Sequence, residues 1–315
     1  MNLQTHNHEA RRNMLAKEIE EILRRRLGWN EIMMDNIMWR FIGVNANVFL
    51  DYGIDPHIWL QSLNGLGDLE NEYWFGAANG DLYIMKWRQQ FEVFTGTSSA
   101  PGVFYFLKLM ETIKRPSVKI VRIGNYIEVQ FYVLLRHWPW YNVNYEAIKD
   151  FNTNGLARYL AGLLDTDGSV ISNYEEKKYY RLEIRISACK NCDGFLKYLR
   201  SVVYEKLGIR GNVSRSVKSS ELRFQNRQAV ELFRYIRQYV IHPLKRLRAE
   251  VYLRYYDKEL TIKEYEYLYE PLKYDDNGND PKRNHAVDAL TQAAPQTHTH
   301  GEKFKAPKNI YETPR

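Results

Sequence analysis

The sequence predicts a protein of the mixed α/β (α+β) class, built from two tandem repeats with the same order of elements, αββαββα. Segments of alternating apolar and polar residues, typical of half-buried strands, lie between segments with helical spacing. The same order of elements starts again at Asn154. With 44% hydrophobic and 26% charged residues among 315, the chain has the composition of a globular protein with an apolar core.

The chain divides into four parts. Residues 1–67 form a helical N-terminal extension, in which 10–27 has an amphipathic helical pattern. The first repeat occupies 68–152, and the second repeat with its C-terminal helices occupies 153–273. Residues 274–315 are polar and contain proline, so we expect a tail.

In the first repeat, alternation is clearest in 118–123 and 126–131, with Gly124-Asn125 as the tight turn between two strands. The second repeat opens with a helix capped by Thr153 or Asn154. Its strands are expected at 170–173, 180–187, 213–217 and 221–224. Helices are expected at 193–207, 227–240 and 243–255, the last continuing to near Tyr269.

Several classes of protein are excluded or disfavoured. No segment approaches the roughly 20 apolar residues that cross a bilayer, so we expect no membrane partner. The N-terminal sequence lacks the apolar segment of a secretory signal, which predicts an intracellular protein. Cys189 and Cys192 form one CxxC without a second pair at zinc spacing, and we expect ordinary thiols in a reducing compartment.

Positive charge is concentrated in one part of the chain. Residues 177–250 hold 18 Lys and Arg against six Asp and Glu, a net charge of +12 in a chain whose total is +7. A folded segment with this excess repels itself unless a polyanion lies against it. The distribution therefore favours nucleic acid as the partner over an ordinary solvated surface.

The sharpest motif opens the second repeat, LAGLLDTDGSV at 160–170. A degenerate counterpart, WFGAANGDLYI, lies at 74–84 in the first repeat. Asp81 and Asp167 stand at the same motif position, 86 residues apart, which is one repeat length. An Asp-Gly pair by itself is a common turn, but two acids at equivalent repeat positions indicate a shared site.

Small residues four apart predict how the two motifs meet. They are Gly76 and Gly80 in the first motif helix, and Gly162 and Thr166 in the second. Two helices with small residues on the facing sides can approach more closely than the usual distance of roughly 8–10 Å between helix axes. Each helix would then bring its acid beside the other, where like charge and the negative helix end are unfavourable. Divalent metal removes both penalties, and Mg²⁺ suits such a site and phosphodiester hydrolysis.

These motifs resemble the signature of the LAGLIDADG homing endonucleases. The resemblance covers about 68–258. It implies a single-chain, pseudo-symmetric monomer whose two antiparallel sheets form a saddle over double-stranded DNA, with Asp81 and Asp167 as metal-binding catalytic residues. It further implies basic residues beside the acids, for which Lys245 and Arg185 match best. In the first repeat, the strand position equivalent to Arg185 is expected at Glu92, so the two sites should be unequal.

The resemblance also implies that strand residues of both sheets contact DNA. In the first repeat these are Lys86, Arg88, Gln90, Lys119 and Arg122. In the second repeat they are Lys178, Arg181, Arg185, Arg215, Lys218 and Arg223. Mg²⁺ is the expected cofactor, and Mn²⁺ or Ca²⁺ would also fit such oxygen ligands.

The leading hypothesis is a site-specific homing DNA endonuclease that hydrolyses phosphodiester bonds of a long duplex target. Two alternatives remain open from the sequence. One is an RNA maturase that assists the splicing of its host intron, with that RNA as its partner. The other is a cleavage-deficient DNA-binding protein on the same scaffold.

Overall fold

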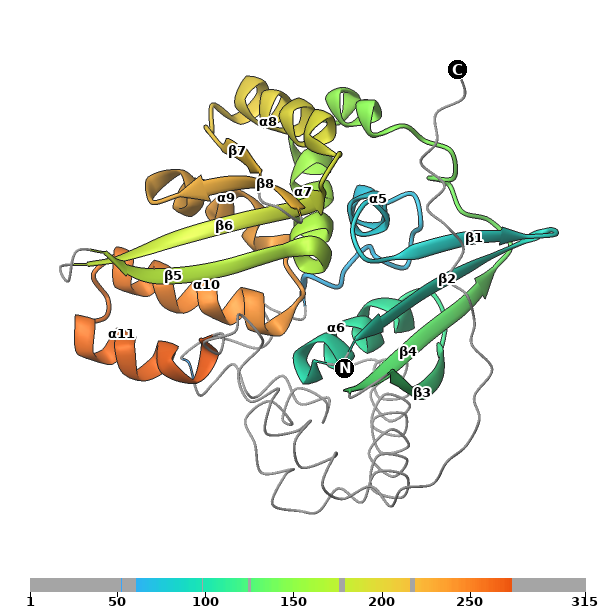
Figure 1. The fold of residues 1–315 in the computed structure, drawn as a ribbon, viewed down its shortest axis with the longest axis horizontal. Coiled ribbons are helices and arrows are strands. Elements are labelled where there is room, and N and C mark those ends of the chain that lie inside the picture. Colours follow the sequence, from blue (N-terminus) through green and yellow to red (C-terminus); the bar gives the residue numbers. More distant parts are fainter. Residues whose placement is uncertain are drawn as a thin grey trace, which may run out of the picture.

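The computed structural model describes Tyr52 and residues 61–97, 99–123, 126–175, 179–215 and 219–273. The predicted helix at 10–27, the turn at 124–125 and the polar tail at 274–315 lie outside these described residues. The two repeats follow one another along the chain and lie side by side (Figure 1).

The first repeat contains helix α5 (Glu72–Ala78) and helix α6 (Ala100–Glu111). Its strands are β1 (Tyr83–Trp87), β2 (Gln90–Thr97), β3 (Ser117–Ile123) and β4 (Tyr126–Leu135). They form an antiparallel sheet in the order β1-β2-β4-β3. In place of the expected third helix the chain makes only the 3₁₀ turn η2 (Tyr145–Asp150).

The second repeat begins with α7 (Thr153–Asp167), continues with α8 (Asp193–Leu207) and has strands β5 (Gly168–Glu175), β6 (Tyr179–Cys189), β7 (Asn212–Arg215) and β8 (Ser219–Gln225). The order β5-β6-β8-β7 repeats that of the first sheet. The helices that follow are α9 (Arg227–Ile236), α10 (Pro243–Tyr256) and α11 (Ile262–Tyr269), with short 3₁₀ turns η3 (Arg237–Tyr239) and η4 (Glu270–Leu272). The α+β class and the duplication are therefore confirmed.

Helix boundaries differ from the predictions where capping decides them. The cap of α7 is Asn152, whose side chain accepts a hydrogen bond from Gly155 N, and not Thr153 or Asn154. The chain also breaks between α10 and α11, where Thr261 starts a new helix with a capping box. No helix in the described part of the chain has the length and apolar character needed to cross a membrane.

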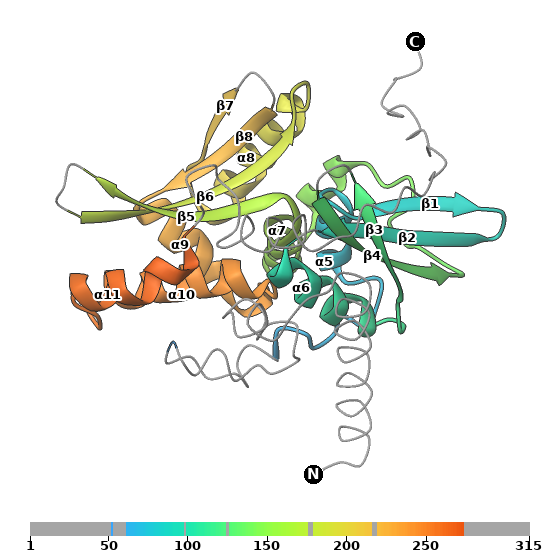
Figure 2. The same ribbon diagram turned by 60° about the horizontal axis from the view of Figure 1, so that its bottom comes forward.

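Each sheet has one buried face and one face that is more open. In β2 and β4 the buried residues alternate, as at Phe91, Val93 and Phe131, and in β6 the same holds for Leu182 and Ile184. The residues between them form what we call the open face of each sheet. The two sheets extend to either side of α5 and α7, with α6, α10 and α11 beneath them (Figure 2).

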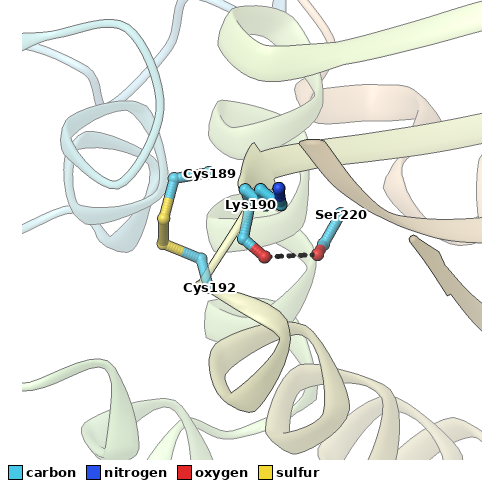
Figure 3. Close-up of a disulfide and its surroundings, with 4 residues drawn as sticks. All are labelled: Cys189, Lys190, Cys192 and Ser220. Carbon is cyan, nitrogen blue, oxygen red and sulfur yellow. Dashed lines mark hydrogen bonds between the residues drawn. A yellow bond between two sulfur atoms is a disulfide. The ribbon is translucent and has the colours of Figure 1, made fainter. Parts of the chain in front are cut away.

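The two cysteines were expected to be ordinary free thiols, and this prediction is wrong. Cys189, the last residue of β6, is joined by a disulfide to Cys192, which caps α8 (Figure 3). Cys192 N also donates to Cys189 O at 2.9 Å, and Ser220 Oγ donates to Lys190 O at 3.2 Å. The tight turn between β6 and α8 places the two sulfur atoms close together, and the disulfide closes this turn.

Candidate active site

The two motif helices cross at the centre of the molecule with almost no space between their backbones. A methyl group built on Gly76 would lie 2.0 Å from Tyr159 O, and one on Gly162 would lie 2.1 Å from Tyr73 O. Each glycine therefore faces the backbone of the other helix. We call this contact between α5 and α7 the seam.

Polar contacts cross the seam in a reciprocal way. The hydroxyl of Tyr73 donates to Asp165 Oδ2 at 2.7 Å, and Asn79 Nδ2 donates to the Tyr159 hydroxyl at 3.1 Å. Tyr73 and Tyr159 are 86 residues apart, and so are Asn79 and Asp165. These four residues were not among the predicted site residues, although the repeat offset that relates Asp81 to Asp167 also relates them.

The last pair of small residues meets just beyond α5. That helix ends at Ala78, so Gly80 lies in the turn after it and not within the helix as expected. A methyl group on Gly80 would lie 2.0 Å from Thr166 Oγ1. The Thr166 hydroxyl in turn donates to Gly162 O at 2.9 Å. These contacts hold the two C-terminal ends of the motif segments together.

Asp81 and Asp167 meet at these ends, one from each repeat. Asp167 is the last residue of α7 and is half-buried, whereas Asp81 follows α5 and is exposed. Burial raises the pKa of Asp167 well above its usual range, and the neighbouring charge of Asp81 and a hydrogen bond between the two carboxyl groups raise it further. Two carboxyl groups this close favour sharing a proton or binding a cation.

Asp165, two residues before Asp167, is fully buried. Burial raises its pKa to about 6, against the opposing effects of its hydrogen bonds and of the Lys245 charge. Besides the Tyr73 hydroxyl, Ile241 N donates to Asp165 Oδ2 at 2.6 Å. Asp165 therefore ties the seam to the segment that leads into α10.

Lys245 lies near the acids, and its ammonium group is hydrogen-bonded to the backbone of α7. Its ammonium donates to the carbonyl oxygens of Leu164, Asp165 and Thr166 at 3.0, 2.7 and 2.8 Å. These contacts use all three N–H groups of a lysine, so none is left for phosphate in this arrangement. The lysine neutralises the negative end of the helix and lowers the pKa of Asp167 through its charge.

A polar cavity of about 140 Å³ opens beside the pair. Its walls come from both repeats and from α10, and include Asp81, Asp165, Thr166, His242, Lys245 and Arg248. The described ranges contain no group of three or more His, Cys, Asp or Glu side chains arranged to hold a metal ion, so the carboxylates of Asp81 and Asp167 are the acidic ligands that we consider. This set fits Mg²⁺ or a similar ion, which takes one or two protein carboxylates and completes its shell with water and phosphate.

Arg185 lies on the open face of the second sheet within an ion-pair network. Its Nε donates to Glu183 Oε1 at 2.8 Å, and Arg223 Nε lies 3.7 Å from the same oxygen. Glu183 is buried on this otherwise open face and is also within 4.0 Å of Arg181. Arg223 forms its shorter ion pair with Glu221, at 2.6 Å, so three arginines and two carboxylates leave a small positive excess on this face.

The register of the two sheets corrects the expected equivalence of Arg185 and Glu92. Arg185 pairs with Ser169, two residues after Asp167, and the residue two after Asp81 is Tyr83, which pairs with Phe94. Phe94 is thus the counterpart of Arg185. Glu92 corresponds to Glu183, since they pair with Met85 and Ile171 at the next equivalent positions.

Two residues expected to contact DNA lie on the wrong face of their strands. Lys86 pairs with the buried Phe91 and places its ammonium over the rings of Phe91 and Tyr141. Arg215 pairs with the buried Ser220 and forms an ion pair with Asp193 at the start of α8. Because successive side chains of a strand point to opposite faces of the sheet, both residues lie on the face that packs against the helices.

The remaining predicted contacts fall into four groups. Gln90, Lys119, Arg181 and Arg223 occupy the open faces. Arg88 lies in the β1–β2 hairpin turn with a φ of 55°. Arg122 pairs with Ile127, and Lys178 and Lys218 are outside the described residues.

Part of the basic excess is internal. Arg246 and Arg248 of α10 are among the largest fully buried side chains, and Lys245 beside them is buried as well. Arg246 Nε donates to Glu250 Oε1 at 2.6 Å, and burial lowers the pKa of Arg246. These cations serve the packing of α10, and the charge available to a polyanion is smaller than the sequence count.

Both repeats thus have the same strand order, and their first helices pair through glycine with the motif acids at the ends. The chain has a LAGLIDADG-type fold. No family model and no curated protein matches the sequence. The chain is similar in structure to the homing endonuclease I-WcaI bound to its DNA recognition sequence, at 12% identity and a TM-score of 0.45 over 57% of this chain and 85% of that one.

Two further solved structures are similar to this LAGLIDADG-type chain. I-DmoI in complex with DNA and Mn is 18% identical with a TM-score of 0.37, over 55% of this chain and 97% of that one. The N-terminal LAGLIDADG domain of DUF199/WhiA is 14% identical with a TM-score of 0.38, over 58% and 88% of the two chains.

Proposed function

We propose that the protein is a divalent-metal-dependent DNA endonuclease of the homing type, acting as a monomer on a long duplex. The observation that carries this proposal is the meeting of Asp81 and Asp167 at the seam, where the charge of Asp81 disfavours ionisation of the half-buried Asp167 and raises its pKa. A pair of acids that costs the fold stability in this way needs a compensating cation. Both acids come from one chain, so the site requires no second copy.

Four residues would have distinct roles in metal binding, positioning and phosphate binding. Asp81 and Asp167 would hold the metal, with Mg²⁺ preferred and Mn²⁺ or Ca²⁺ as other occupants. A bound divalent ion supplies an activated water and stabilises the leaving oxygen in phosphodiester hydrolysis. Lys245 would position Asp167 by fixing the end of α7. Arg185 would hold the backbone phosphates beside the acids, where its guanidinium is partly exposed.

Cleavage is tested with a library of random duplexes, because the target sequence is unknown. The ends produced in Mg²⁺ are captured and sequenced, and wild-type protein should give one recurrent sequence. Asp167→Asn should remove these ends and retain DNA binding, because it removes a metal-binding carboxylate and no cationic contact. Asp257→Asn is the matched control, since that acid pairs with Arg234 on the surface.

Two observations favour the second candidate, a nucleic-acid-binding protein without cleavage, such as a maturase for intron RNA. The first repeat has Phe94 where the second has Arg185, and the Lys245 ammonium is occupied by carbonyl oxygens. Tight binding in Mg²⁺ with no recurrent ends from the wild-type protein would favour this candidate. Improved splicing of the flanking intron would then identify it as a maturase.

A further inference from the structure

A second cavity lies in the second repeat, between α8 and the start of the edge strand β7 (Figure 1). It has a volume of about 370 Å³. We call it the edge pocket, and the following residues line it: Arg200, Ser201, Tyr204, Arg210, Gly211 and Asn212. They offer two guanidinium groups, a tyrosine hydroxyl and an amide as donors, and none of these described residues is Asp or Glu. The chemistry of the lining therefore fits an anion.

The turn after α8 brings Arg210 back over the helix. Gly208 ends α8 with a left-handed φ of 68°, a conformation that glycine adopts without strain. The Arg210 guanidinium then lies 5.4 Å from the centroid of the Tyr204 ring, and its backbone N donates a hydrogen bond to Gln228 Oε1. These contacts hold the arginine at the pocket and leave its positive charge uncompensated.

The two arginines of the edge pocket differ from those of the open face in their charge partners. The arginines on the open face of this sheet share their charge with Glu183 and Glu221. Within the described part of the chain, neither Arg200 nor Arg210 forms an ion pair. Glu205 of α8 is exposed and does not line the pocket. Two neighbouring cations without an acid partner favour a bound anion.

The pocket continues a row of residues that crosses the open face of the second sheet from the acid pair. The row consists of successive strand partners across β5, β6, β8 and β7: Ser169, Arg185, Arg223 and Asn212. Ser169 follows Asp167 by two residues, and Asn212, at the other end of the row, lines the edge pocket. The surface that we propose to bind DNA therefore leads directly to the pocket.

The width of the sheet identifies the anion that would meet its edge. The three gaps between the four strands span roughly 14 Å, at about 4.8 Å each. The major groove of B-DNA is about 12 Å wide, and a phosphate backbone borders it on either side. A sheet of this width that lies in the groove has its edge strand at one of the two backbones. The anion at the edge pocket is then a phosphate group of the duplex.

We propose that the edge pocket binds a backbone phosphate of the DNA duplex between the guanidinium groups of Arg200 and Arg210. The Tyr204 hydroxyl and the Asn212 amide would be further donors. This inference rests on the proposed function and adds to it a phosphate-binding site outside the two open faces. A contact of this kind fixes the position of the duplex across the sheet and carries no sequence information.

The test measures duplex binding by the full chain with fluorescence anisotropy in Ca²⁺ over a range of salt concentrations. The duplex is one recovered by selection for binding to wild-type protein. The double variant with Arg200→Gln and Arg210→Gln should bind roughly 10-fold more weakly. It should also lower the slope of log affinity against log salt by about 1, the value for one phosphate contact. Arg210→Lys keeps a positive charge and should keep most of the slope.

Arg234→Gln is the matched control, because Arg234 also lies over a tyrosine ring, that of Tyr256, but is paired with Asp257. Ethylation interference gives a second readout, in which neutralising the contacted phosphate should weaken binding by wild type and not by the double variant. A double variant that binds as Arg234→Gln does at every salt concentration would overturn the proposal. If wild type selects no duplex, the proposed function fails as well, whereas duplex selection with no effect of the double variant removes this inference alone.

Discussion

At the scale of residues, Asp167 carries an electrostatic cost at the seam. It is half-buried at the negative end of α7, next to the carboxyl group of Asp81, and burial is the largest cause of its raised pKa. Lys245 offsets part of this cost through its charge and its bonds to the last carbonyl oxygens of the helix. The fold therefore maintains an acid where an uncharged residue would be more stable, which is typical of functional sites.

Without metal, Asp167→Asn should stabilise the protein, and more so at higher pH. The fold raises the pKa of Asp167, so the folded state binds more protons than the unfolded state, and stability falls as pH rises through the raised pKa. Denaturant unfolding in EDTA at about pH 5 and pH 8 should show the variant's advantage growing by about 1 kcal/mol or more, since one pKa unit is about 1.4 kcal/mol. An advantage that shrinks with rising pH would contradict this account of the pair.

At the scale of elements, the contact of α5 with α7 sets the geometry of everything else. Gly76 and Gly162 each lie against a carbonyl oxygen of the opposite helix, so neither position has room for a side chain. Tyr73 and Tyr159 then reach across to Asp165 and Asn79. The acids at the helix ends are held together because the backbones touch.

Gly76→Ala and Gly162→Ala should each destabilise the protein by roughly 3 kcal/mol or more, because overpacking against backbone forces the helices apart. Gly194 of α8 has no atom within 4 Å of an added methyl group. Gly194→Ala should therefore stabilise the protein by up to about 1 kcal/mol through helix propensity. Chemical denaturation of the three variants measures this contrast, and similar effects at all three positions would exclude close helix contact.

The sequence was informative for elements and less so for faces. Helix α8 and the acids at equivalent motif positions could be predicted, because helical periodicity and the repeat offset are local signals. Lys86 and Arg215 were placed on the wrong face, since a shift of one residue in a short strand reverses every side chain. Buried Lys245 could not be distinguished from a surface cation, because its carbonyl partners lie about 80 residues earlier.

At the scale of the whole molecule, the two repeats have the same backbone topology but different surfaces. The strand orders are the same, yet the second sheet presents Arg185 and Arg223 where the first presents Phe94 and Tyr132. The acid pair, in contrast, is completed only when both repeats fold against each other. The two repeats therefore share one centre, while their open faces differ in chemistry.

Duplex binding should depend on the second sheet in a salt-dependent way. Arg185→Gln should weaken binding and lower the slope of log affinity against log salt by about 1, the effect expected for one phosphate contact. Arg215→Gln is the matched control, because Arg215 lies on the opposite face beside Asp193. Anisotropy titrations over a range of salt concentrations measure both, and equal loss for the two variants would argue against the surface around Arg185 and Arg223 as the binding surface.

The most direct test of the central claim is the shift in thermal unfolding that Mn²⁺ or Mg²⁺ produces in wild type, Asp81→Asn, Asp167→Asn and the double variant. Ligands that bind only the folded state raise its stability, and residues of one site are not additive in such a cycle. We predict that either single substitution removes most of the metal-dependent shift and that the double variant loses no more. A shift that persists in the double variant would contradict a metal site formed by these two acids.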